Sequence, residues 1–352
     1  MANPSPANAP ARDFHDEIIT IDGTSPLMGE NHQEKFVDWY KQGRVTAFAP
    51  TMSEGPMSSV ASLTDKLNTL DNLAFMLKLV HKRNDLIVVR TAADVLRAKQ
   101  EGKLGVMLNF QSPTAFEYNL DLVHLYKALG VGVVQLTYNA RNQFGNGILE
   151  RGDSGLSNLG VALVKELNDA RVIVDVGHTG VKTALDAIEF SSTPVIISHA
   201  NSRNKFDNNR NVPDDLIKAI ARNGGLIGAV MYPAFIRKEP RPTLDDYIDH
   251  IKYLVDLVGP DHVAIGSDYF GGQWGVITDE EAQRLYERNI EVGAWDRATY
   301  PAPPWVYPEG IETPKTLYNL TAGLLRRGFS KDEIRKIWGE NWLRVMRQVW
   351  GA

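Results

Sequence analysis

Short apolar segments rich in β-branched residues alternate with longer amphipathic segments along most of the chain. The short segments are typical of buried strands, and eight are predicted, at 17–23, 45–51, 105–111, 133–139, 172–178, 194–200, 226–232 and 262–268. Between them, apolar residues recur at helical spacing, which predicts helices over segments that include 70–84, 120–130, 157–170 and 244–259. The pattern therefore indicates a succession of βα units.

Eight βα units within about 250 residues predict a closed (β/α)8 TIM-like barrel of the α/β class. A doubly wound open sheet is the competing architecture, but no G-x-G-x-x-G motif follows the first strand. Two further helices are predicted over 313–328 and 330–351, with apolar faces that pack on the barrel. We expect a flexible leader at 1–16 and one barrel domain at 17–352, with a long loop insertion at about 272–312.

Charge and composition exclude several classes of partner. The net charge is −5 and no basic stripe is present, so neither nucleic acid nor an anionic membrane is an expected partner. No apolar run approaches the roughly 20 residues that span a bilayer. A small molecule is therefore the expected ligand.

The chain contains no Cys, which excludes disulfides, thiolate zinc sites and cysteine nucleophiles. The first residues lack the charged and apolar regions of a signal peptide, so a cytoplasmic location is the default expectation. A mature periplasmic or secreted form given a new start Met would look the same, so the compartment stays open.

Functional residues of such barrels lie at the C-terminal ends of the strands. Those positions hold Thr24, Gln111, Tyr138, His178, His199, Tyr232 and Asp268. A lone histidine is more often structural, but His178 and His199 end consecutive strands and should converge above the barrel. Neutral imidazole is a common zinc ligand, so this pair predicts a metal site or an acid–base pair.

Two charged residues near the same end of the barrel have both a structural and a functional interpretation. Asp268 could cap the loop that follows its strand, or it could act as a metal ligand or general base. Arg210 lies in the loop above the sixth strand. A solvated loop arginine is the common case, yet at this place a guanidinium could hold a substrate carboxylate through two parallel hydrogen bonds.

Four stretches of the chain carry a family pattern. They are "VIVDVGH", "PVIISHANSRNKFDNNRNVPDDLIKAIARNGGLIGAVMYPAF", "YIDHIKYLVDLVGPDHVAIGSDYFGG" and "LTAGLLRRGFSKDEIRKIWGENWLRVMRQ". They closely resemble the membrane (renal-type) dipeptidase family of the amidohydrolase superfamily, and the resemblance covers residues 17–350. It implies a zinc-dependent barrel that cleaves dipeptides and related amides, and because family members commonly form dimers, it also implies a homodimer.

The resemblance also assigns roles to individual residues. The family pattern has five metal-binding positions, and His178 and His199 match two of them. Arg210 matches the arginine that binds the substrate carboxylate, and Asp268 matches the catalytic aspartate. Tyr138 stands where family members have a histidine that polarises the scissile carbonyl.

The other three metal positions depart from the family pattern. The His-x-Asp pair of the first strand falls on Thr24 and Pro26, and the bridging Glu of the third strand falls on Gln111. Two Zn²⁺ ions roughly 3.5 Å apart repel each other by about 19 kcal/mol at an effective dielectric constant of about 20. Both carboxylates that offset this repulsion are replaced here, which argues against a two-zinc centre.

A single-metal set remains, formed by His178, His199 and Asp268. Two imidazoles and a carboxylate can bind one catalytic Zn²⁺. Without a metal, the two histidines would instead act as acid and base. Both alternatives stay open on the sequence alone.

The expected function is hydrolysis of a dipeptide or another small carboxylate-bearing amide, with at most one metal ion. In this scheme Asp268 handles protons, Tyr138 donates to the developing oxyanion and Arg210 holds the carboxylate, with Gln111 and Tyr232 beside the substrate. The first alternative is a lyase or isomerase that acts on a small carboxylate in the same fold. The second is a non-catalytic binding protein.

Overall fold

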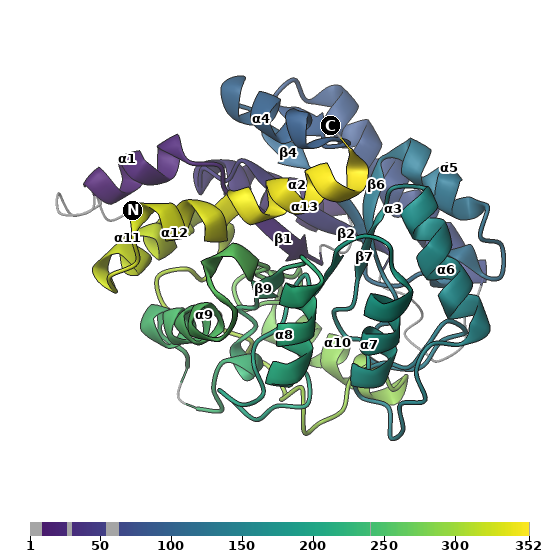
Figure 1. Cartoon of the computed structure of the whole chain (residues 1–352). Helices are drawn as coiled ribbons and strands as arrows, with labels where there is room; N and C mark the ends of the chain where they lie inside the picture. The colour runs from purple at the N-terminus through teal and green to yellow at the C-terminus, as the bar shows by residue number, and fades with distance from the viewer. Residues whose placement is uncertain (1–8, 27–29, 54–62, 240, 352) are drawn as a thin grey trace.

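The computed structural model describes residues 9–26, 30–53, 63–239 and 241–351, whose parallel strands form a closed barrel surrounded by helices (Figure 1). The barrel strands are β1 (Ile21–Ser25), β2 (Ala47–Ser53), β4 (Leu104–Val106) with β5 (Leu108–Phe110) as one interrupted strand, β6 (Val131–Gln135), β7 (Ile173–Asp175), β8 (Val195–Ile196), β9 (Ile227–Ala229) and β10 (Val263–Ile265). Each lies within or beside one of the eight predicted segments, which confirms the (β/α)8 prediction.

Backbone hydrogen bonds close the barrel between β8 and β9 and between the segment after β10 and β1. Ile197, just after β8, donates its N–H to Leu226 at 2.9 Å and accepts from Gly228 at 2.8 Å, which joins β8 to β9. β9 then pairs with β10 in parallel. Beyond β10, the N–H of Asp268 donates to the carbonyl of Thr24 in β1 at 3.0 Å, so the last strand meets the first.

One strand was not predicted from the sequence. β3 (Leu86–Val88) pairs in parallel with β4, beside the first half of the interrupted barrel strand. Its three residues are too few to show the alternation of apolar and polar positions that is typical of a strand. The sequence therefore could not distinguish this strand from the end of the preceding helix.

Helices follow the strands as βα units require. They are α2 (Glu30–Gln42), α3 (Leu63–Lys82), α4 (Ala92–Gln100), α5 (Leu122–Leu129), α6 (Asn158–Asp169), α7 (Val181–Phe190), α8 (Asp214–Arg222) and α9 (Leu244–Val258). Local sequence sets several of their ends. Ser157 accepts from the N–H of Gly160 and so caps α6, and Gly130 ends α5 with a left-handed φ of 110°.

The C-terminal helices pack on the barrel, as predicted. α11 (Tyr318–Arg326) is followed by α12 (Lys331–Arg335), a π-helical turn at Lys336–Glu340 and α13 (Asn341–Trp350), the yellow helix of Figure 1. α13 covers the N-terminal end of the barrel with buried apolar side chains. Trp342 lies against Gly23 of β1, and Trp350 lies against Gly132 of β6, where a Cβ on either glycine would overlap the indole ring.

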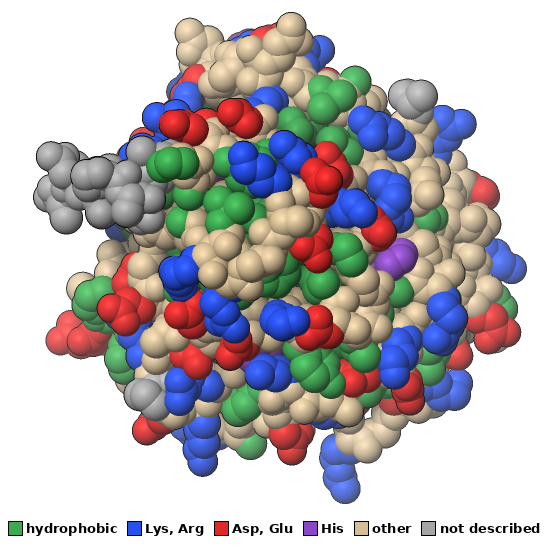
Figure 2. Space-filling model, turned by 60° about the vertical axis from the view of Figure 1, so that its left-hand side comes forward, with side chains coloured by type: hydrophobic (Ala, Val, Ile, Leu, Met, Phe, Trp, Pro, Cys, Tyr) green, Lys and Arg blue, Asp and Glu red, His purple; other side chains and the backbone are tan. Residues whose placement is uncertain are grey.

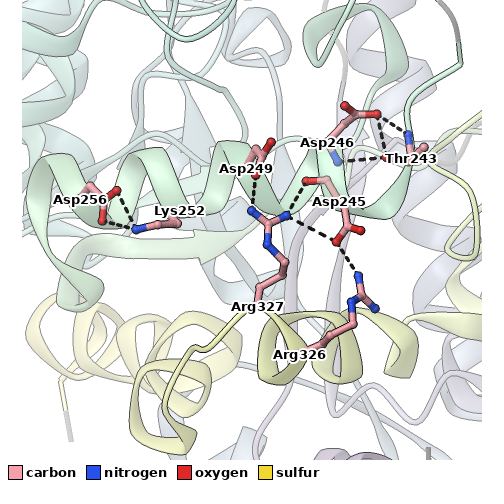
Figure 3. A network of polar contacts seen from close by, with 8 residues as sticks. All are labelled: Thr243, Asp245, Asp246, Asp249, Lys252, Asp256, Arg326 and Arg327. Atoms are coloured by element: carbon pink, nitrogen blue, oxygen red, sulfur yellow. Dashed lines mark hydrogen bonds and ion pairs between the residues drawn. The ribbon is translucent and has the colours of Figure 1, made fainter.

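Ion pairs join α11 to α9 at the molecular surface (Figure 3). Arg327 pairs with Asp249 and Asp245 of α9, and Arg326 pairs with the same Asp245. All four side chains are at least partly exposed, so each pair contributes little to stability by itself.

The predicted flexible leader is not flexible over residues 9–16. They begin helix α1 (Ala9–Glu17), which buries Phe14 and His15. The imidazole of His15 contacts the hydroxyl of Thr321 on α11 at 2.6 Å and the carbonyl of Gly43 at 3.2 Å, and burial lowers its pKa to about 3. Composition suggested a leader, but long-range contacts order this helix. Residues 1–8 lie outside the described part of the chain.

The insertion predicted as a loop at about 272–312 is a loop only in part. It contains α10 (Asp279–Glu291), which begins with a capping box between Thr278 and Glu281. The segment after α10 returns to the barrel and buries Trp295, Tyr300 and Trp305. These aromatic residues bring the insertion to the C-terminal end of the strands.

On the face shown in Figure 2, basic and acidic side chains are interspersed across the surface. Among the residues that the structure describes, no helix has the length and apolar character needed to cross a bilayer.

Candidate active site

Every predicted site residue lies at the C-terminal end of the barrel. Thr24 is in β1, while the others follow their strands: Gln111 after β5, Tyr138 after β6, His178 after β7, His199 after β8, Tyr232 after β9 and Asp268 after β10. All are buried except Tyr138, which is partly buried. Arg210 reaches the same place from the loop between β8 and α8 and is also buried.

The two histidines contact each other directly. Their Nε2 atoms are 2.8 Å apart, which is a hydrogen bond in which one nitrogen donates and the other accepts. The Nδ1 atom of His199 lies 2.7 Å from the hydroxyl of Ser198, and Nδ1 of His178 lies 2.7 Å from Oδ1 of Asn139. His178 takes a left-handed φ of 55°, which turns its ring toward His199.

The surroundings of both imidazoles disfavour their protonated forms. Burial lowers the pKa of His178 well below its usual value, and the nearby charge of Arg210 and the contact with His199 lower it further. Burial and Arg210 likewise lower the pKa of His199. A neutral pair can accept a proton at one ring nitrogen while it donates from the other.

Tyr138 covers one face of the histidine pair. Its ring stacks on that of His178 with centroids 4.2 Å apart and planes inclined by 24°. The indole N–H of Trp295 donates to the Tyr138 hydroxyl at 3.2 Å. This donation polarises the hydroxyl toward giving its own proton to an acceptor in the site.

Arg210 is a buried cation with a nitrogen that makes no hydrogen bond. Its Nη2 donates to the carbonyl of His199 at 2.8 Å, and its Nε lies 3.1 Å from Nδ1 of His178. Nη1 is buried and has no hydrogen-bond partner in the structure as described. Arg210 also forms no ion pair with any described carboxylate, although a buried guanidinium normally requires an anion.

The residues at the replaced metal positions make other contacts or offer the wrong atoms. The hydroxyl of Thr24 donates to its own neighbour, the carbonyl of Gly23, at 2.6 Å. Nε2 of Gln111 is buried without a described hydrogen-bond partner, and its amide offers a metal only a neutral carbonyl oxygen in place of a carboxylate. Pro26 has no side-chain ligand to offer.

Asp22, the carboxylate nearest to this corner in sequence, is held by hydrogen bonds from two other segments. It accepts hydrogen bonds from the hydroxyl of Tyr40 at 2.6 Å and from both the backbone N–H and the hydroxyl of Ser267. Burial raises its pKa to about 6, and these hydrogen bonds oppose the rise. Asp22 therefore links β1 to β10 and does not replace the missing metal ligand.

The residues present do not fit a two-zinc centre. Within the described ranges, no group of three or more His, Asp or Glu side chains is arranged to hold a metal ion, and the single-metal set of His178, His199 and Asp268 stays a prediction. Two nitrogens that bind one tetrahedral Zn²⁺ lie roughly 3.3 Å apart, since Zn–N is about 2.0–2.1 Å. At 2.8 Å the Nε2 atoms would have to separate before they could share an ion. Binding of at most one Zn²⁺ ion stays a prediction.

Asp268 and Tyr232 follow the last two barrel strands, β10 and β9. Asp268 has a left-handed φ of 60°, and its carbonyl accepts from the hydroxyl of Tyr307. The hydroxyl of Tyr232 is buried and has no hydrogen-bond partner among the described atoms. Burial raises the pKa of Tyr232 well above the usual value, and the charges of Tyr300 and Asp268 add to this effect.

Two contributors to the site were not found from the sequence. Asn139 contacts His178, and its left-handed φ of 53° turns its side chain toward that ring. The aromatic segment 294–300 reaches the site from the insertion, since Trp295 contacts Tyr138 and stacks on Tyr300 at 4.7 Å. The dipeptide Tyr-Asn at a strand end is a weak signal. Two of the partners of Asn139, Ala294 and Tyr300, lie over 150 residues away.

Sequence comparisons match most of the chain to one family. The family profile described as Membrane dipeptidase (Peptidase family M19) matches residues 12–287 and 304–351. An uncharacterized dipeptidase of Schizosaccharomyces pombe is 34% identical over 212 residues, which cover 58% of this chain and 51% of that protein. Dipeptidase tcpJ of Claviceps purpurea is 27% identical over 292 residues, or 82% of this chain and 61% of that protein. The chain thus spans between half and two thirds of the length of these relatives.

Solved structures agree with this placement. The crystal structure of an amidohydrolase from Pseudomonas aeruginosa has a TM-score of 0.85 and 34% identity, and the match covers 97% of this chain and 99% of that chain. A metallopeptidase of Rhodobacter sphaeroides, solved with a phosphinate mimic of L-Ala-D-Ala, shares the fold with a TM-score of 0.77, at 20% identity over 95% of this chain and 99% of that chain. The chain belongs to the membrane dipeptidase family, peptidase family M19.

Proposed function

We propose that this protein is an enzyme that hydrolyses a small amide bearing a free carboxylate, such as a dipeptide, with at most one metal ion. The observation that carries the proposal is Arg210, a fully buried guanidinium whose Nη1 has no hydrogen-bond partner among the described residues. A buried cation without a counter-ion is costly, and a bound carboxylate would offset that cost. The family match supports dipeptide-like substrates.

The neighbouring residues support roles in amide hydrolysis. Tyr138 is the proposed donor to the carbonyl oxygen, because Trp295 already donates to its hydroxyl. Asp268 is the proposed base that takes a proton from the attacking water. The His178–His199 pair is proposed to pass a proton to the leaving amine, which requires the 2.8 Å contact between the two Nε2 atoms to open, because both Nδ1 atoms already have partners. Gln111 and Tyr232 supply hydrogen-bonding atoms that bind and orient the substrate. No step in this scheme is assigned to a metal ion.

A second candidate is a lyase or isomerase that acts on a small carboxylate with an aromatic group. The aromatic wall of the site favours it. Tyr138 stacks on His178, and Tyr232 lies within 5.9 Å of Tyr300 and of Phe270, measured between ring centroids. Such walls bind flat apolar groups through stacking. In this case Arg210 would keep its role, while no amide would be cleaved.

A matched pair of substrates tests the proposed function. We expect the protein to cleave dipeptides with a kcat/KM about 100-fold or more above that for the same dipeptides with an amidated C-terminus, since only the free acid pairs with Arg210. Release of the free amino acid is measured for a panel of both stereochemistries, with and without added Zn²⁺. Equal cleavage of acid and amide would contradict the role of the carboxylate. If no amide is cleaved while small carboxylates still raise the Tm, hydrolysis is wrong and the second candidate is favoured.

A further inference from the structure

The side chains proposed to bind the substrate are covered in this structure. Arg210 is fully buried and Tyr232 is 3% exposed. A substrate carboxylate that pairs with Nη1 of Arg210 can therefore enter only when a covering segment moves. The segment 294–309 of the insertion, which we term the strap, lies over these residues.

The strap packs against the surroundings of Arg210 through two tyrosines. Tyr300 meets the ring of Phe235 edge-on with centroids 5.4 Å apart, and the guanidinium carbon of Arg210 lies 5.7 Å from the centre of the same ring. Tyr300 and Tyr307 also pack against Tyr232, with centroids 5.9 and 6.3 Å apart. Phe235 and Tyr232 are thus shared between the strap and the binding site.

Neutral hydrogen bonds join the strap to the loop after β6. The side-chain amide of Asn139 donates to the carbonyl of Ala294 at 3.0 Å and to the hydroxyl of Tyr300 at 2.9 Å. The indole N–H of Trp295 donates to the hydroxyl of Tyr138 at 3.2 Å. A neutral hydrogen bond contributes little net stability, because water replaces the lost partner when the contact opens.

The loop that carries Arg210 also contacts the strap. Asn208 accepts from the backbone N–H of Arg210 at 2.8 Å and donates to the carbonyl of Thr299 at 3.3 Å. Asn209 donates to the hydroxyl of Thr299 at 3.3 Å. Movement of the strap away from this loop would break these two contacts with Thr299 and leave the backbone contact of Arg210 in place.

The backbone of the strap can move without disrupting a helix or a strand. For residues 296–304, the one backbone–backbone hydrogen bond in the described structure is internal, from Tyr300 to Asp296 at 2.9 Å. A glycine adjoins each end of the strap, Gly293 with a φ of 73° and Gly310 with a φ of 86°. A Cβ on either glycine would meet no atom within 4 Å, so both ends have open space in which to rotate.

We propose that the strap is a lid that opens to admit the substrate to Arg210 and closes over the site before the reaction. Opening exposes the buried rings of Trp295 and Tyr300, so the open state is the minor one. Closure excludes bulk water, which strengthens the pairing of Arg210 with a carboxylate. The entry of substrate rests on the proposed function, whereas the opening of the strap does not.

Thiol labelling of the full chain measures the opening without a substrate. The chain contains no Cys, so Thr299→Cys places a single thiol at a buried position of the strap. We expect iodoacetamide to label it at least about 100-fold faster than the thiol of Ala184→Cys, which is buried in α7 and becomes exposed on global unfolding. Each rate is divided by the rate in the urea-unfolded chain. Equal protection of the two thiols overturns the proposal.

A second substitution tests whether the contacts of the strap hold it closed. Tyr300→Phe removes the hydroxyl that accepts from Asn139, and it should raise the labelling rate of Thr299→Cys about 2- to 10-fold. Tyr318→Phe is the matched control on α11, where the ring contacts Arg12, and should leave the rate unchanged. The same labelling rate in the Tyr300→Phe variant and in its parent contradicts the role of this contact in closure.

A cross-link tests whether the opening admits the substrate. Asn209→Cys combined with Thr299→Cys places two thiols where the native side chains touch, and dibromobimane bridges them. We expect bridging to lower kcat/KM for dipeptides at least about 10-fold relative to the same double variant without the bridge. Unchanged cleavage in the bridged protein overturns the lid. Fast labelling at position 299 in a protein that cleaves no dipeptide would show that the strap opens and that only the proposed function is wrong.

Discussion

Replacing Arg210 with Gln is expected to lower kcat/KM for dipeptides by at least about 100-fold and to leave the low rate on their C-terminal amides unchanged. A buried, charge-assisted pair between a guanidinium and a carboxylate costs about 2–5 kcal/mol to disrupt, and each 1.4 kcal/mol is tenfold in rate. The Nη1 atom of Arg210 has no partner among the described residues that would lessen this loss. The discrimination between acid and amide should therefore disappear in the variant.

The same replacement should not destabilise the free protein. Arg210 is buried without an ion pair among the described residues, so its charge is a cost in the absence of ligand. We expect the free energy of unfolding of Arg210→Gln to stay within about 1 kcal/mol of wild type or to rise. Arg222→Gln, at the exposed end of α8, is the matched control and should change neither activity nor stability. A large loss of stability with unchanged acid–amide discrimination would show that Arg210 is structural.

Replacing Trp342 with Ala is expected to lower the free energy of unfolding by about 3–5 kcal/mol. Trp342 is fully buried where α13 covers the N-terminal end of the barrel, and its ring fills the space that the missing side chain of Gly23 leaves. A small residue at position 342 would leave a cavity between the helix and β1. Urea unfolding followed by circular dichroism measures the loss.

A milder change at the same position checks the cause of that loss. The indole N–H of Trp342 is buried without a hydrogen-bond partner in the described structure, so it contributes nothing beyond packing. Trp342→Phe should therefore recover most of the stability that Trp342→Ala loses. A loss below about 1 kcal/mol in the alanine variant would mean that α13 does not close the barrel as the structure places it.

Much of the fold was predictable because each barrel strand is a short apolar segment, and amphipathic segments with helical spacing lie between the strands. The exceptions have local causes. β3 has three residues, too few to show a period. α10 buries only Ala282, Tyr286 and Asn289, so its apolar face is narrow, although the capping box at Thr278 could have revealed its start. α1 is held by contacts of His15 with residues far away in sequence, which no local pattern contains.

The candidate site likewise has features that the sequence predicted and features that it did not. The rule that functional residues follow barrel strands found His178, His199, Tyr232 and Asp268, because strand ends can be read from the sequence. The direct contact between the two histidines could not be predicted, since it depends on the left-handed backbone at His178. The position of Asn139 between His178 and the insertion was equally hidden, because three segments meet there only in the folded chain.

The central claim is that this chain has lost the two-zinc centre of its family, because three metal-binding positions hold Thr24, Pro26 and Gln111. The zinc content of the purified protein tests this claim most directly. The protein is purified without chelator from zinc-supplemented cells, dialysed against metal-free buffer and measured by elemental analysis beside the His199→Ala variant. We predict no more than one Zn²⁺ per chain, and any bound equivalent should be lost in the variant, because the only imidazole pair at the barrel end among the described residues is His178 and His199. Two equivalents of Zn²⁺ per chain would contradict the account.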